Sequence, residues 1–384
     1  MRRVLLPLCL MLGTLWAHPP AAPKVCGLWV VRHNLLRASR IDSVLRFAAQ
    51  NQFTDLFVQV RGRGDAYYNS HLEPRAERLA EDFDPLAYLL EKNQQYHFRI
   101  HAWVNVFYVW SNDEKPESRE HVLNRNPEWL VYPVQLDSSH SDTTLTGRRN
   151  AEGWFQSPIQ PEVQQHVSAV IEDILNHYPV DGIHLDYIRY PDHRFDFNPL
   201  ARQRFKQTYM LDPLDFKRDP LKFIEQFGWS GYEIFFTRWA EFLRRELSDF
   251  VEQLTTSIHH RHPGVIVSAA VKADLAAAHW QYYQEWDRWL REGWLDWAVP
   301  MNYTPNQQYF HSRIEKIIGS GDINRIVMGI ALYNQPPDSA LSQIRFIQNN
   351  KFPGYVLFSY DQFLKDVKLR RKYFREIEKT EKKP

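Results

Sequence analysis

The sequence predicts an α/β fold, a single (β/α)8 TIM barrel. Eight short apolar segments are each followed by a longer amphipathic one, which is the repeating unit of this barrel. No sequence repeat and no Gly/Ser-rich linker divides the 384 residues. A doubly wound open sheet rarely runs through so many units. We therefore expect one barrel domain over residues 23–370, followed by a charged tail over 371–384.

The expected strands are runs rich in aliphatic and aromatic residues between turn residues, at 27–32, 55–60, 98–104, 182–187, 265–271, 297–302, 325–332 and 355–359. Helical periodicity occupies the intervening segments 41–51, 85–95, 161–177, 232–260, 281–292, 309–318 and 339–349, and a last helix begins at Gln362. Two connections are longer, at roughly 106–158 and 188–230, after the third and fourth strands. Both follow the carboxyl ends of strands, where barrel active sites are built, so we expect them to form the walls of a cleft.

Residues 1–22 have the basic start and the apolar run of a secretory signal peptide. The run is too short for a comfortable membrane span, and cleavage after Ala17 or after Ala22 fits equally. We expect a secreted or periplasmic protein without a transmembrane span. Lipid anchoring through Cys26 is a weaker alternative to release by signal-peptide cleavage, because the residues before Cys26 match a lipoprotein box poorly. The 47 basic and 46 acidic residues balance, so nothing favours a nucleic-acid partner.

The fourth expected strand carries the strongest sign of chemistry. Strand side chains alternate, so His184 and Asp186 point to one side while Ile183 and Leu185 point to the other. Aliphatics on one face and a carboxylate at the strand end are typical of a barrel strand that delivers a catalytic acid to the mouth. The alternative is an aspartate that caps the next segment, beside a core histidine.

Glycoside cleavage uses two carboxylates that flank the bond. Asp186 is the first candidate, and its partner is either Asp65 or Asp274, each of which could instead be a surface or capping aspartate. Polar and aromatic residues that gather at the strand ends are candidates for binding substrate: Gln59, Arg61, Trp103, Asn105, His184, Tyr187, Arg189, Tyr190, Asn302 and Tyr303.

A metal site is a further possibility, since His33, His101, His184 and Asp186 could all approach the barrel mouth. The chain has no His-x-His pair on the first strand and no His-Glu-x-x-His helix. It also has no Gly-x-Ser-x-Gly turn and no phosphate-binding glycine loop. We expect no cofactor and no catalytic metal.

The block 178–191 resembles the signature of the bacterial glycosyl hydrolase-like 10 family, and weaker blocks follow that family in order at 57–61, 64–68, 101–105, 161–164, 295–303 and 354–359. The resemblance implies a TIM barrel, export to the cell envelope and action on glycan strands, particularly peptidoglycan strands stripped of stem peptides. It implies that Asp186 is catalytic and that Asp65 lies in the matching second-strand loop. At Gly62 and Arg63 the chain departs from relatives that place proline and then an acidic residue there, which puts the second acid in doubt.

These patterns predict an exported glycoside hydrolase acting on a polysaccharide, with peptidoglycan the leading substrate. Retaining, inverting and lytic chemistry all stay open. One alternative is a glycan-binding protein without turnover on the same fold. Another is a metal-dependent polysaccharide deacetylase.

Overall fold

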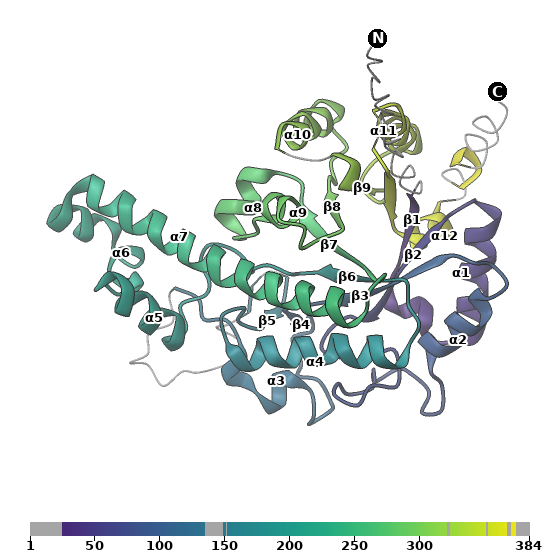
Figure 1. Cartoon of the computed structure of the whole chain (residues 1–384), viewed down its shortest axis with the longest axis horizontal. Coiled ribbons are helices and arrows are strands. Elements are labelled where there is room, and N and C mark those ends of the chain that lie inside the picture. Colours follow the sequence, from purple (N-terminus) through teal and green to yellow (C-terminus); the bar gives the residue numbers. More distant parts are fainter. Residues whose placement is uncertain are drawn as a thin grey trace, which may run out of the picture.

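A computed structural model of the chain describes residues 25–134, 149–150, 152–320, 323–350, 352–366 and 370–373, so the expected signal peptide lies outside the described residues. Eight parallel strands close into a barrel in the order β1-β10-β9-β8-β7-β6-β3-β2 (Figure 1). They are β1 (Val25–Val30), β2 (Asp55–Arg61), β3 (Arg99–Asn105), β6 (Gly182–Asp186), β7 (Ile266–Lys272), β8 (Trp297–Met301), β9 (Val327–Ala331) and β10 (Gly354–Phe358). The predicted (β/α)8 fold is confirmed, with every expected strand present.

The helices that follow these strands cover the outside of the barrel: α1 (Ala38–Gln50), α2 (Pro85–Asn93), α4 (Pro161–His177), α7 (Pro220–Arg261), α8 (Leu275–Gln281), α9 (Trp286–Arg291), α10 (Gln307–Ser320), α11 (Pro337–Asn349) and α12 (Tyr360–Lys365). The helix expected over 281–292 was wrong in extent, because α8 ends at Gln281 and α9 begins only at Trp286. Among the described helices, none is both long enough and apolar enough to cross a membrane.

The barrel interior and the helix-facing layer form two separate cores. Ile183 and Leu185 of β6 belong to the outer core, where the helices pack. The interior core takes the alternate strand positions, among them Trp29, Phe57 and Trp103. A filled interior confines any ligand to the open end of the barrel, above these rings.

The two long insertions differ in structure. After β3, the short strands β4 (Tyr108–Trp110) and β5 (Trp154–Phe155) pair antiparallel, with the short helix α3 (Val122–Arg125) between them. After β6, the chain forms α5 (Pro199–Tyr209), α6 (Pro213–Lys217) and the first part of α7, which together project away from the barrel (Figure 1). Gly228 interrupts α7 with φ 74°, a left-handed conformation that favours glycine.

The end of the described chain also packs on the barrel. Tyr373 falls within the expected charged tail, yet it is only 2% exposed. Its ring stacks on Phe53 with centroids 5.7 Å apart. Tyr373 therefore contributes to the hydrophobic core.

Candidate active site

A pocket of about 370 Å³ opens at the carboxyl ends of the strands, a size common for small-molecule sites. Side chains from most of the barrel strands meet there: Trp29 from β1, Gln59 from β2, Trp103 and Asn105 from β3, Asp186 from β6, Lys272 from β7, Met301 from β8 and Phe358 from β10. The insertion after β3 adds Tyr108 and Glu152, so it contributes to the wall as expected.

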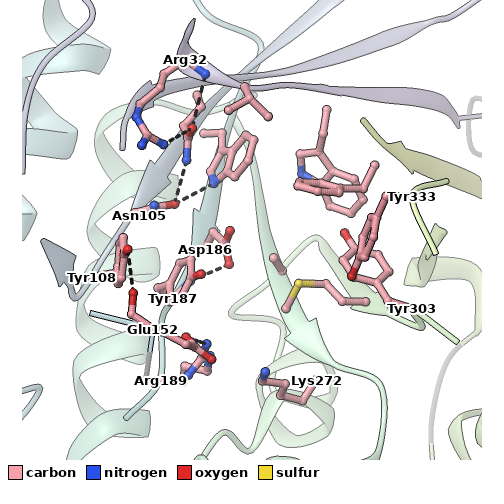
Figure 2. A pocket seen from close by; sticks show the side chains of 17 residues that line it. Arg32, Asn105, Tyr108, Glu152, Asp186, Tyr187, Arg189, Lys272, Tyr303 and Tyr333 are labelled. Carbon is pink, nitrogen blue, oxygen red and sulfur yellow. Dashed lines mark hydrogen bonds and ion pairs between the residues drawn. The ribbon is translucent and has the colours of Figure 1, made fainter. Parts of the chain in front are cut away.

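Asp186 points into the middle of this pocket (Figure 2). Its Oδ1 accepts a 2.7 Å hydrogen bond from the backbone N–H of Tyr187. Tyr187 has φ 52°, an uncommon backbone conformation for a non-glycine residue and one that often marks functional sites. Burial raises the pKa of Asp186 to about 6, against the opposing influence of the Tyr187 N–H and the nearby cations. A carboxyl group with such a pKa is mostly protonated below pH 6 and still partly protonated near neutral pH, as a general acid must be.

A second carboxylate, Glu152, lines the same pocket. Its Oε2 lies 2.7 Å from Nη2 of Arg189, a salt bridge visible in Figure 2. Arg189 is buried, and its guanidinium lies 4.8 Å from the ring centroids of Tyr187 and of Tyr282. No strand or motif pattern in the sequence marks Glu152, although it lies in the segment 106–158 that was predicted to be functional.

Lys272, at the end of β7, is a third charged group in the pocket. Burial, together with the charge of Arg189, lowers its pKa to about 8. Its Nζ lies 4.2 Å from the ring centroid of Tyr282, and among the described residues no carboxylate forms a salt bridge with it. An ammonium group without an ion-pair partner at the mouth suits an anionic group on a ligand.

Aromatic rings form the opposite side of the pocket. Tyr303 packs against Trp29, Phe358 and Tyr333, with ring centroids 6.2, 5.6 and 6.2 Å apart respectively. In Figure 2 the Tyr303 and Tyr333 side chains lie together, across the pocket from Glu152. Flat apolar rings that face a charged wall suit a sugar, which has both C–H faces and hydroxyl groups.

His184 lies beneath the pocket and positions one of these rings. It is fully buried, and burial lowers its pKa well below the ordinary value. The indole N–H of Trp29 donates to His184 Nε2 at 3.2 Å, so the proton of the neutral ring is on Nδ1, which lies 2.9 Å from Ser268 Oγ. The structure thus gives His184 no direct access to the pocket, where it was predicted to bind substrate.

Three predicted residues share one hydrogen-bond network at the mouth. Asn105 Oδ1 accepts from Trp103 Nε1 at 2.9 Å and from Gln59 Nε2 at 3.4 Å. Gln59 Oε1 in turn accepts from Arg32 Nη1 at 3.1 Å. The strand register between β2 and β3 shifts just beyond Gln59, an irregularity common beside active sites.

Other predicted binding residues serve the fold instead. Arg61 is buried against Glu73 at 2.7 Å and donates to the backbone oxygens of Asn105 and Val106. The Asn302 amide donates to the Phe310 backbone oxygen at 3.0 Å. The buried ring of Tyr190 packs edge-on against Tyr283. Like His184, these three do not line the pocket, whereas Tyr187, Arg189 and Tyr303 do.

Neither of the expected partner carboxylates lines the pocket. Asp274 caps helix α8 by accepting the Ala277 N–H at 3.0 Å. Asp65 is buried and accepts the Arg63 N–H at 2.8 Å. The Arg63 guanidinium packs over the Trp110 ring, 4.3 Å from its centroid, outside the pocket. The two aspartates that were predicted as partners of Asp186 therefore accept hydrogen bonds from backbone N–H groups close by in the sequence.

The four residues considered for a catalytic metal are not brought together. His101 Nε2 lies 2.9 Å from Asp55 Oδ1, at the first residue of β2 and away from the mouth. His33 Nε2 lies 2.6 Å from Asp361 Oδ1, and His184 is held by Trp29 and Ser268.

A (β/α)8 barrel with carboxylates and aromatic rings at its carboxyl-terminal mouth is the arrangement typical of glycoside hydrolases. More narrowly, the chain belongs to the glycosyl hydrolase-like 10 family, whose model matches residues 25–333. The family expected from the motifs is thereby confirmed.

Similar proteins include the glycosyl hydrolase DigH of Escherichia coli K12, with 23% identity over an alignment of 270 residues that covers 65% of this chain and 54% of DigH. The glycosyl hydrolase YngK of Bacillus subtilis is 24% identical over 272 residues, 65% of this chain and 45% of YngK. The chain thus spans about half the length of these curated relatives. Among solved structures, the PgaB (BpsB) glycoside hydrolase domain of Bordetella bronchiseptica shares the fold, with TM-score 0.67 and 13% identity over 91% of this chain and 98% of the domain.

Proposed function

We propose that this chain is an exported glycoside hydrolase that cleaves peptidoglycan glycan strands. The observation that carries the proposal is the placement of Asp186 and Glu152 in one pocket, with the raised pKa on Asp186 and the salt bridge on Glu152. Two carboxylates in different environments suit two different roles in glycoside cleavage.

In the proposed reaction, the Asp186 carboxyl group donates its proton to the glycosidic oxygen as the bond from that oxygen to the sugar carbon breaks. Glu152, paired with Arg189, either attacks the same carbon to form a glycosyl ester, which water deprotonated by Asp186 then cleaves, or takes a proton from the water that attacks the carbon directly. In the direct route Glu152 releases that proton to solvent and Asp186 takes one back. Water is consumed, each fragment leaves with a hydroxyl group, and both carboxyl groups return to their starting protonation states.

Lys272 supports peptidoglycan over a neutral glycan. Strands without stem peptides carry a free lactyl carboxylate on every second sugar, and an ammonium group without an ion-pair partner is a suitable partner for it. The aromatic side, with Tyr303 and Phe358, suits the apolar faces of the sugars.

Incubation of the purified chain with intact peptidoglycan, peptide-free strands and chitin oligosaccharides, followed by mass spectrometry, tests the proposal. We expect new reducing ends, with peptide-free strands as the best substrate. Anhydro ends would instead indicate lytic cleavage. Saturable binding to the strands without cleavage would overturn the hydrolase and favour a glycan-binding protein.

A further inference from the structure

A cluster of metal-ligating side chains lies on the outside of the barrel, away from the pocket. His71 comes from the segment after β2, while Asp173 and His177 lie one turn apart on α4. Among the described residues, these are the only group of three or more His, Cys, Asp or Glu side chains close enough to share an ion. None of the three lines the pocket.

Both imidazoles converge on the same carboxylate oxygen. His71 Nδ1 lies 2.8 Å from Asp173 Oδ1, and His177 Nδ1 lies 3.2 Å from it. The two rings lie side by side, with centroids 4.7 Å apart. The His71 Nδ1–H donates to the Asp173 carboxylate, whereas the His177 Nδ1–H donates to the Asp173 backbone oxygen at 2.8 Å. One cation could replace both protons and use all three side chains as ligands, with the exposed His177 ring turning away from that backbone oxygen.

The spacing requires only a small adjustment to bind a zinc-type ion. The three donor atoms all lie within 4.8 Å of one another. Ligand atoms that lie about 2.0–2.1 Å from a tetrahedral zinc ion are about 3.3 Å from one another. Any two of the three donor atoms must therefore approach each other by about 1.5 Å at most. The two histidines are exposed enough to rotate, with side-chain exposures of 67% and 50%.

The carboxylate, by contrast, is already fixed in place. Asp173 is buried, and its Oδ2 accepts hydrogen bonds from Ser70 Oγ and from the His71 backbone N–H, both at 3.1 Å. Such outer partners orient a ligating carboxylate and raise metal affinity. Simple imidazole–carboxylate pairs elsewhere, such as His279 with Asp287 at 2.7 Å, lack a third ligand and provide a comparison.

We propose that His71, Asp173 and His177 form a structural site for a divalent transition-metal ion of the zinc type, with water completing the coordination. The ion would fasten the segment around residue 71 to α4. Two residues further along that segment, Glu73 forms salt bridges with Arg61 of β2 and with His166 of α4. The ion would therefore strengthen the connection between this segment and the barrel without touching the glycan site.

Calorimetric titration of zinc chloride into tag-free, chelator-treated protein tests the site. We expect one ion per chain, a higher unfolding temperature with zinc, and absorption bands of tetrahedral cobalt when cobalt(II) is used instead. His71→Ala and His177→Ala should each lower the affinity by at least about tenfold, since even outer partners are worth that much. His279→Ala should bind as the wild type does.

Circular dichroism shows whether each variant is folded before titration. Absence of saturable binding in the wild type overturns the site. Undiminished binding in a folded His71→Ala/His177→Ala double variant overturns it equally, and neither result depends on glycan cleavage.

Discussion

The Arg189 guanidinium joins the two long insertions of the barrel, because its Nη2 lies 2.7 Å from Glu152 Oε2. Arg189 follows Asp186 by three residues, just beyond β6, whereas Glu152 comes from the insertion after β3. One buried cation thus fixes the second carboxylate relative to the strand that carries the first.

Removing this cation should impair catalysis more than folding. Arg189→Met leaves Glu152 without its partner, and we expect kcat to fall by roughly 10²-fold with Arg189→Lys restoring part of the loss. Arg194→Met, which breaks an exposed pair with Asp192 in the same segment, is the matched control and should leave kcat unchanged. Equal rates for Arg189→Met and wild type would contradict the positioning role.

Activity should depend on the protonation of Asp186. Because burial raises its pKa to about 6, the proton-donating form is depleted as the pH rises through that value. We expect kcat/KM on a neutral glycan to decline above about pH 6. A rate that stays flat from pH 5 to 8 would exclude Asp186 as the acid.

The same pKa predicts that Asp186 lowers stability at neutral pH. The folded protein resists ionisation of this group. The stability that the protonated Asp186 contributes is therefore fully present below its ordinary pKa of 3.8 and is lost as the pH rises through about 6. Asp186→Asn should therefore raise the free energy of unfolding by up to about 3 kcal/mol above pH 6, and by almost nothing below pH 4. Denaturant unfolding at pH 4 and pH 7.5 measures both values, and a gain at pH 4 as large as that at pH 7.5 would contradict the cause.

Lys272 should select for anionic glycans. Its pKa of about 8 means that the ammonium charge is lost as the pH rises through that value, so KM for peptide-free strands should rise above pH 8. Lys272→Gln should raise KM for these strands severalfold while KM for chitin oligosaccharides stays the same. A similar loss on both substrates would assign Lys272 a general role.

Glu73 should be needed for stability. It is buried with Arg61, and this cation together with His166 lowers its pKa to about 2 in spite of burial. Glu73→Ala leaves a buried guanidinium unpaired, and we expect a loss of about 3–5 kcal/mol in unfolding free energy. The wild-type contribution of Glu73 should be present above about pH 4.5 and should decline as the pH falls towards 2. Glu81→Ala, at an exposed position nearby, should change stability by less than about 0.5 kcal/mol.

The sequence was sufficient for the barrel because strand periodicity is a local signal. The same alternation placed Asp186 at the mouth, but it could not show how far below the mouth each inward side chain lies. His184 points inward yet lies below the pocket, bonded to Trp29. Asn302 follows its strand, yet its amide turns to Phe310.

Glu152 could not be found by such signals. It lies in irregular chain before β5, and contact with Arg189 brings it to the pocket across 37 residues of sequence. Asp274 looked equally suitable in the sequence, but capping of α8 explains its position.

Mass spectrometry of peptide-free peptidoglycan strands after incubation with matched variants tests the central claim most directly. We predict cleavage by the wild type and by Asp274→Asn, since asparagine caps a helix as well as aspartate does. Asp186→Asn and Glu152→Gln should bind the strands but release roughly 10²–10⁴-fold less product. Wild-type product levels from a folded Asp186→Asn or Glu152→Gln variant would contradict the assignment of these two carboxylates.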